Sequence, residues 1–223
     1  MKIFLLLICF VSVIHTTTLK EIYDTALPEG EFDKVLKLEK GKVYKGGLSI
    51  GMFYNPFTGT YDSLDYSSIK IEGNGSILDL QRGEIHIAYK KNRMDIDSCA
   101  IINGKIRYNG FPGEYPNNDY SNSIPYGNVK NVTLYSPVDY GIRFEGAGID
   151  SYINKCLVVD CISTGGGFEQ YGSFPSEIIR TGTSYAFSIF DWYGVPDLID
   201  NWSYNRLYPD EPLNHFSMLC EYG

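Results

Sequence analysis

Positive charge is scarce in this 223-residue sequence, which has 19 Lys and Arg residues against 27 Asp and Glu residues. The formal net charge of -8 argues against a phosphate-backbone partner, because such binding needs clustered Lys and Arg side chains that release counterions. We therefore expect no nucleic-acid partner. The same charge repels polyanionic sugars at long range, so a site for uronic-acid chains would need a local basic cluster or a bound cation.

Histidine and cysteine are also scarce, at three and five residues. No C-x-x-C pair and no His spacing supports zinc, and the two histidines that follow the N-terminal segment are too few for a His-rich metal site. Four cysteines follow that segment, and they allow three disulfide pairings or buried free thiols. They are Cys99, Cys156, Cys161 and Cys220.

Long apolar runs are absent except at the N-terminus, where an uncharged stretch extends from Ile3 to Ile14. It follows Met1-Lys2 in the layout of a secretory signal peptide and is too short to span a bilayer as a stable helix. We predict a signal peptide over residues 1–16 and a single domain over residues 17–223. The mature protein is expected to be secreted or extracytoplasmic, monomeric and free of the membrane. A membrane-retained start is the alternative, because the cleavage motif is unclear.

Helical periodicity is nearly absent after residue 30. The 19 Tyr, 12 Phe, 23 Gly and 10 Pro residues, with alternating Ile and Val, indicate many short strands joined by turns. The best helix candidate is residues 18–27, which Pro28 ends. One face of that helix would carry Leu19, Ile22, Tyr23 and Ala26.

The strand-like segments repeat. Residues 97–102 align with residues 154–159, and residues 131–135 fit between them, which gives 23 positions from Asn131 to Asn154. This length suits one turn of a parallel β-solenoid, with an outward loop inside residues 109–128. We therefore interpret Gly73-Asn74-Gly75 as a corner between two sheets of one coil, and expect a parallel partner for residues 69–71. An internal asparagine stack of Asn131 and Asn154 would satisfy turn backbone groups.

Three phrases carry a family resemblance: "LPEGEFDKVLKLEKGKVYKGG", "IKIEGNGSILDLQ" and "RMDIDSCAIINGKIRYNG". They resemble the first coils of secreted proteins of the pectate-lyase-like superfamily, and the likeness runs from about residue 28 to 165. The resemblance implies an all-β chain folded as a right-handed parallel β-helix (solenoid) with a short N-terminal capping helix. It also implies a polysaccharide partner bound along the outer groove. From about residue 168 the rhythm decays, and we expect a cap or incomplete coils.

The superfamily's polysaccharide lyases remove the proton next to a uronate carboxylate while Arg or Ca²⁺ neutralises that carboxylate. The resemblance therefore directs attention to the segment densest in acids and bases. There we assign Arg143 and Lys155 as catalytic candidates. A Ca²⁺ cofactor would take Asp139, Glu145 and Asp160 as metal ligands. The alternative is that these are solvated strand and turn residues, which every coil must present.

Aromatic residues supply a second set of candidates, because a sugar ring can pack on an aromatic plane. The substrate-binding candidates are Tyr115, Trp192, Tyr193 and Trp202. The alternative is that they pack over the side or end of the solenoid. His86 alternates with Ile85 and Ile87 and is interpreted as a surface or satisfied strand histidine.

The motifs of known enzymes are missing. Neither the W-x-D-H and R-x-P-x-x-R motifs of the commonest pectate lyases nor the polygalacturonase elements occur, so no activity transfers residue by residue. We predict a carbohydrate-active protein that binds a polysaccharide and, if catalytic, is a lyase acting by β-elimination. The alternatives are a noncatalytic structural or adhesive solenoid and a glycoside hydrolase.

Glycosylation sequons begin at Asn74, Asn131 and Asn201, and they carry glycans only in a eukaryotic secretory route. The first two fall inside predicted repeat strands or corners. That position weighs against glycosylation.

Overall fold

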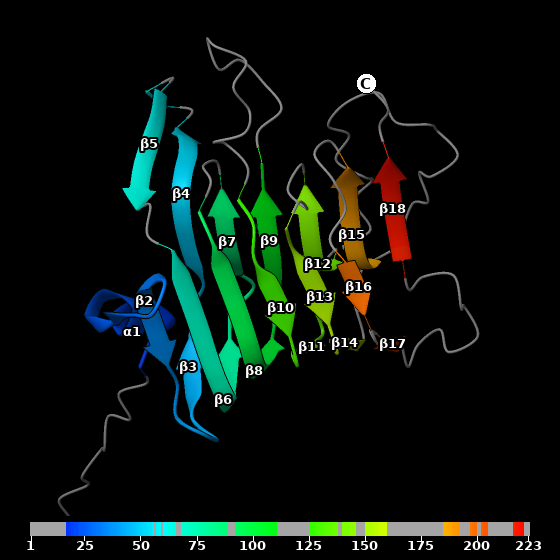
Figure 1. The fold of residues 1–223 in the computed structure, drawn as a ribbon, viewed down its shortest axis with the longest axis horizontal. Coiled ribbons are helices and arrows are strands. Elements are labelled where there is room, and N and C mark those ends of the chain that lie inside the picture. The colour runs from blue at the N-terminus through cyan, green and yellow to red at the C-terminus, as the bar shows by residue number, and fades with distance from the viewer. Residues whose placement is uncertain are drawn as a thin grey trace, which may run out of the picture.

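The computed structural model describes residues 17–55, 57–58, 60–65, 68–88, 92–110, 125–137, 140–145, 150–159, 185–191, 197–199, 202–204 and 216–220. Within these ranges the chain is all-β apart from one helix, α1 (Leu19–Thr25), and its strands form two sheets (Figure 1). Both sheets are built mainly from parallel pairs.

The larger sheet has eleven strands within the described ranges. They are β1 (Leu27–Glu29), β2 (Phe32–Lys37), β3 (Val43–Lys45), β6 (Ile69–Asp79), β8 (Met94–Ile102), β10 (Asn128–Lys130), β11 (Thr133–Tyr135), β13 (Tyr152–Asn154), β14 (Leu157–Val159), β16 (Asp197–Ile199) and β17 (Trp202–Tyr204).

The smaller sheet has seven strands within the same ranges. They are β4 (Leu48–Asn55), β5 (Thr60–Asp65), β7 (Glu84–Ala88), β9 (Lys105–Asn109), β12 (Tyr140–Glu145), β15 (Tyr185–Asp191) and β18 (Phe216–Cys220). Strands β4 and β5 form an antiparallel hairpin at one edge, seen in cyan in Figure 1.

The chain alternates between the sheets, and apart from β1 and β5, whose pairings are antiparallel, each strand pairs in parallel with its counterpart in the next coil. Ile69 on β6 pairs with Lys34 on β2 and with Met94 on β8. The predicted parallel partner for residues 69–71 is therefore confirmed, and Gly73-Asn74-Gly75 is not a hairpin turn. On the smaller sheet Ile106 pairs in parallel with Ile85 and Ile142.

The Gly73-Asn74-Gly75 corner bends one sheet and does not join two. Strand β6 runs through it, and both halves of β6 pair with β8, with a register shift between Glu72 and Ser76. The prediction of a boundary between two sheets was wrong. The sheet stays continuous because the chain turns at left-handed residues, which in β6 include Gly75 with a φ of 75°. One non-glycine left-handed residue lies at the turn of each of four coils. These residues are Asn74, Ser98, Asn131 and Lys155, with φ between 48° and 57°. We call this line of residues the αL corner.

The predicted asparagine stack is wrong, because the middle repeat is shifted by one position. Lys130, not Asn131, pairs with Asp97 and Asn154. Asn131 occupies the exposed αL corner, where its Nδ2 donates a hydrogen bond to Asp97 Oδ1 at 3.0 Å. The buried column beside the corner is formed by Cys99, Val132 and Cys156.

The core lies between the sheets and consists of apolar residues stacked from coil to coil. In the larger sheet, Leu36, Ile71, Ile96, Val129 and Ile153 follow one another in register, each with 0% exposure. Such columns bury apolar surface along the whole stack, which is the main favourable contribution to folding.

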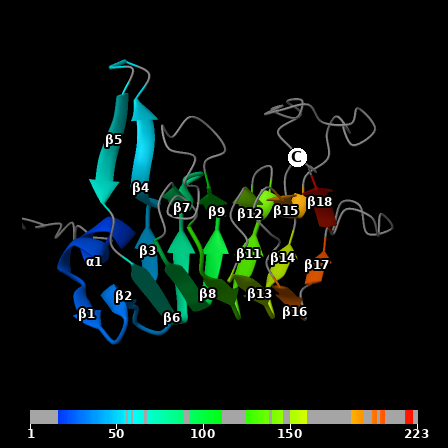
Figure 2. The same ribbon diagram turned by 45° about the horizontal axis from the view of Figure 1, so that its top comes forward.

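Helix α1 covers the N-terminal end of the stack, beside β1 and β2 in Figure 2. Thr18 and Glu21 form a capping box that satisfies free backbone N–H groups at the helix start. Leu19 and Tyr23 are buried, and Ile22 and Ala26 pack partly against the core. The predicted helix and its apolar face are confirmed. No helix in the described part of the chain is long and apolar enough to cross a membrane.

Candidate functional site

The candidate site lies on the outer face of the smaller sheet, on β7, β9 and β12. Side chains alternate between the faces of a strand, so the inward residues identify the outward ones. The inward residues all have 0% exposure and are Ile85, Ile87, Ile106, Tyr108, Ile142 and Phe144. The intervening polar residues that face outward are Glu84, His86, Lys105, Arg107 and Arg143.

Parallel pairing places three of these polar residues in one line across three coils. His86 pairs with Arg107, and Arg107 pairs with Arg143. Adjacent strands lie about 4.8 Å apart, so each of these side chains has the next one within a single strand spacing. Lys105, two residues before Arg107, stands on the same face. We call His86, Lys105, Arg107 and Arg143 the basic row.

Tyr140 holds two members of the basic row in place. Its ring is 4% exposed, with Lys105 Nζ 4.4 Å and Arg143 Cζ 4.3 Å from the ring centroid. Cation–π contacts of this kind orient a cation. When the Asn109 side-chain amide is placed so that both its oxygen and its nitrogen have hydrogen-bond partners, the oxygen accepts a hydrogen bond from Arg107 Nη2 at 3.3 Å.

Glu84 is the acid nearest the basic row. Its Oε1 lies 3.1 Å from Nδ1 of His86, whose side chain is 7% exposed. Burial raises the pKa of Glu84, but the hydrogen bond from His86 and the charges of His86, Arg107 and Lys105 outweigh it, so the pKa is lowered. Glu84 is therefore ionised at neutral pH and fixes the His86 ring against β7.

This arrangement suits an anionic ligand. Guanidinium groups bind carboxylates through paired N–H donors, and the three cations with His86 gather several donors on one half-buried strip of sheet. A Ca²⁺ ion does not fit among them, because the neighbouring groups are cationic. No group of three His, Cys, Asp or Glu residues that could hold a metal ion occurs in the described ranges.

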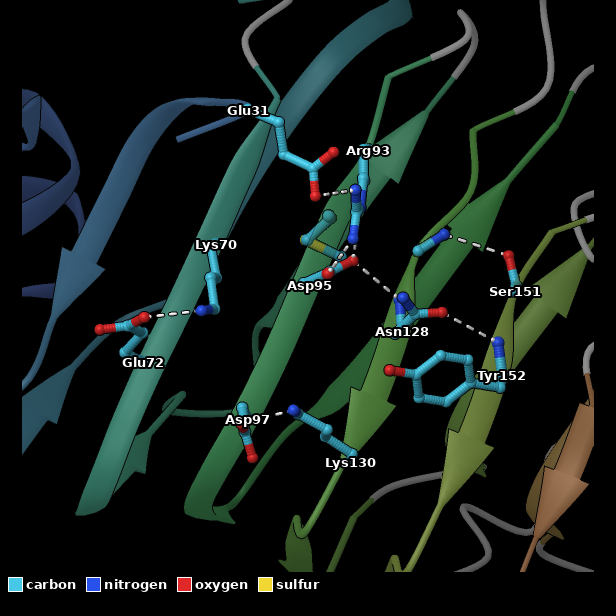
Figure 3. Close-up of polar contacts among 12 residues, drawn as sticks. Glu31, Lys70, Glu72, Arg93, Asp95, Asp97, Asn128, Lys130, Ser151 and Tyr152 are labelled. Atoms are coloured by element: carbon cyan, nitrogen blue, oxygen red, sulfur yellow. Dashed lines mark hydrogen bonds and ion pairs between the residues drawn. The ribbon is translucent and has the colours of Figure 1, made fainter. Parts of the chain in front are cut away.

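The outer face of the larger sheet is different, because its charges pair with one another (Figure 3). Arg93 donates two hydrogen bonds to Asp95, at 3.1 Å and 2.7 Å, and its Nη1 lies 2.6 Å from Glu31. The pKa of Arg93 is raised, first by the hydrogen bonds to Asp95. Lys70 pairs with Glu72 at 2.6 Å.

This outer face also ties adjacent coils together. Asp95 Oδ1 accepts from the backbone N–H of Asn128 at 3.1 Å, and Asn128 Oδ1 accepts from the N–H of Tyr152 at 3.2 Å (Figure 3). Lys130 Nζ lies 3.1 Å from Asp97. These contacts compensate the charges of the face, so it serves stability better than ligand binding.

Beside the αL corner, a cavity of about 440 Å³ crosses three coils. It is lined by Lys37, Leu38, Glu72, Gly73, Asn74, Asp97 and Ser98. Lys37 lies 2.5 Å from Glu29, and Glu72 and Asp97 pair with lysines, so most charges of the lining are already compensated.

The structure does not bring the predicted catalytic pair onto one sheet. Arg143 lies in β12 of the smaller sheet and belongs to the basic row. Lys155 lies at the αL corner of the larger sheet, where it is exposed and has a φ of 51°. Glu145 follows Arg143 by two residues on β12, and its backbone pairs with Asn109.

Most of the other predicted site residues lie outside the described residues. This holds for Asp139 and Asp160 as metal ligands and for Tyr115, Trp192 and Tyr193 as aromatic subsites. Trp202 lies in β17, where its backbone pairs with Leu157. The predicted signal peptide over residues 1–16 also falls outside the described part of the chain.

Sequence reasoning missed Lys105, Arg107 and Glu84 and assigned His86 no function. The signal was present: "EIHIAYK" and "KIRYNG" alternate in the same way, and aligning Ile85 with Ile106 places His86 beside Arg107. Ile106 follows Ile85 by 21 residues, and this spacing of one coil would have given the alignment. Comparisons with protein-family models, curated proteins and solved structures found no match to the chain.

Proposed function

We propose that the chain is an exported right-handed parallel β-helix that binds an acidic polysaccharide across the outer face of its smaller sheet. The alternating parallel strands support this fold, since crossover connections between parallel strands are right-handed in nearly all proteins. The pectate-lyase-like resemblance of residues 28–165 supports a carbohydrate ligand. A uronic-acid polymer is the favoured class, because its repeating carboxylates complement repeated cations.

One observation carries the proposal: the register of His86, Arg107 and Arg143 on successive coils. The chain as a whole is acidic, with a net charge of -8, so two arginines and a histidine on adjacent strands depart from its average surface. They supply the local basic cluster that a polyanionic sugar requires. Arginine suits this task better than lysine because its planar fork binds a carboxylate through two parallel hydrogen bonds.

The test is the affinity of the folded, secreted chain for polygalacturonate and alginate, measured by calorimetry or affinity electrophoresis. Arg107→Gln and Arg143→Gln should each weaken binding about tenfold, the usual effect of one lost charge-assisted hydrogen bond. Lys155→Gln is the control, because it removes an exposed positive charge from the other sheet. Equal losses for all three variants, or no binding by the parent chain, would reject the basic row as the site.

Lyase activity is a second candidate, favoured by His86 between Glu84 and Arg107. In β-elimination a base takes the proton from the carbon next to the carboxylate, the C–O bond to the next sugar breaks, and a C=C bond forms in the uronate ring. Arg107 would stabilise the negative charge on the carboxylate, and His86 would accept the proton. An ultraviolet absorbance rise on polyuronate that His86→Gln abolishes would support this. No rise, with binding retained, would leave a noncatalytic binding protein.

A further inference from the structure

Two glycosylation sequons lie on the αL corner. Asn74 begins Asn-Gly-Ser and Asn131 begins Asn-Val-Thr, and both asparagines are exposed with left-handed φ angles of 48° and 52°. The sequence alone weighed against glycosylation because both sequons fall within repeat strands or corners. The structure changes this argument, because the corner residues point out of the stack although the strands around them are buried.

The two asparagines lie on one edge of the stack. Glu72 pairs with Asp97, and Asp97 pairs with Lys130, so Asn74 and Asn131 sit at the corners of coils on either side of Ser98. Two strand spacings separate them, which is about 10 Å. Gly75 next to Asn74 has only the Lys40 side chain nearby, at 3.7 Å from a built Cβ, so a bulky group has room there.

We propose that Asn74 and Asn131 are N-glycosylation acceptor sites and that their glycans cover the αL corner. The donor is an oligosaccharide linked to a polyprenyl diphosphate. The amide Nδ2 bonds to the anomeric carbon as the carbon–oxygen bond to the diphosphate breaks, Nδ2 loses one proton, and the lipid diphosphate leaves with the electron pair. The substituted amide keeps one N–H, so Asn131 can still donate to Asp97 Oδ1.

The hydroxyl residues of the two sequons indicate when transfer must occur. Ser76 is 1% exposed in β6, whereas Thr133 is exposed in β11. An enzyme that reads Asn-Gly-Ser as an extended peptide cannot reach Ser76 once β6 is paired on both sides. Modification of Asn74 therefore precedes folding of its coil, and the finished glycan lies outside the core.

Glycans on this edge leave the basic row accessible, since His86, Arg107 and Arg143 lie on the smaller sheet and the αL corner lies within the larger one. The inference therefore rests on the proposed export of the chain but not on the ligand proposed for the basic row.

The experiment is secretion of the full chain from cultured eukaryotic cells, followed by peptide N-glycosidase F in ¹⁸O-labelled water and peptide mapping. Asn74 and Asn131 should each be recovered as labelled Asp. Ser76→Ala and Thr133→Ala break the sequons while keeping both asparagines, and each should abolish the label at its own asparagine only. Site-resolved mapping is needed because a third sequon begins at Asn201.

Asn103→Gln is the matched control, because Asn103 is exposed with a φ of 53° but begins no sequon. It should leave both labels unchanged. Secreted, folded chain without label at Asn74 and Asn131 would overturn the proposal. Label that persists in Ser76→Ala and Thr133→Ala would overturn it as well, because it would then arise from spontaneous deamidation.

Discussion

Gly73 occupies a position where no side chain fits. A Cβ atom built on it would lie 2.4 Å from Cys99 Cβ and 2.6 Å from the Ser98 carbonyl oxygen. Gly73→Ala should therefore lower the free energy of unfolding by about 1–3 kcal/mol, as overpacked cores do. Denaturant unfolding measures this, with Gly30→Asn as control because Gly30 has open space around it. Equal stability of Gly73→Ala and the parent chain would contradict the tight approach of β6 to β8.

Cys99 and Cys156 are buried thiols with high pKa values. Burial raises the pKa of Cys99 to about 12 and that of Cys156 to about 11, so both remain protonated and unreactive at neutral pH. Iodoacetamide should leave both unmodified in the native chain and modify both in denaturant, as read by peptide mass spectrometry. Rapid alkylation of either residue in the native chain would show that the column around Val132 opens.

Asp97 should make the stability of the chain depend on pH. Burial raises its pKa, but hydrogen bonds from Ser98, Asn131 and Lys130 outweigh this and lower the pKa below its ordinary value of 3.8. The resulting stabilisation is present above 3.8 and is lost as the pH falls through the folded-state pKa. Asp97→Asn should therefore be less stable than the parent at pH 7, with a gap that closes in acid. A gap independent of pH would refute the role of this ionisation.

At the level of single elements, α1 depends on its capping box. Thr18 accepts a hydrogen bond from the Glu21 N–H at 3.1 Å, and its own N–H donates to Glu21 Oε2 at 2.8 Å. Thr18→Ala should cost about 1 kcal/mol of unfolding free energy, the usual loss for an N-cap residue. Chemical denaturation measures the loss, and Thr17→Ala makes the same change one residue before the cap. Equal effects of the two variants would show that the cap contributes nothing.

The sequence predicted the helix, the all-β character and the parallel partner of residues 69–71 because apolar alternation and the Pro28 stop are local signals. The prediction misplaced the middle repeat by one residue, because it aligned Thr133 with Cys99. The apolar Val132 fills that buried position in the structure, and Thr133 pairs with Ala100. The prediction also missed the β4–β5 hairpin, although Pro56 and Gly59 separate two alternating runs. The basic row depends on pairing across coils, which no single segment of sequence contains.

At the scale of the whole molecule, α1 closes one end of a stack that would otherwise expose apolar side chains and free strand edges. Solenoids need such terminal caps for solubility. A chain that begins at Leu27 should therefore self-associate, because the core surface that Leu19 and Tyr23 cover becomes exposed. Light scattering should show oligomers, whereas Lys20→Ala, on the exposed side of α1, should behave like the parent. A monodisperse truncated chain would show that α1 is not a cap.

The bend in the larger sheet at the αL corner differs in its number of residues from coil to coil. Between equivalent pairs it contains five residues after β2 (38–42), four within β6 (73–76) and two within β8 (98–99), yet the strands on both sides keep their alignment. Extra length at this position is thus absorbed locally. Foreign peptides grafted between Lys40 and Gly41, both exposed, would be displayed on the molecule's edge without disturbing its scaffold.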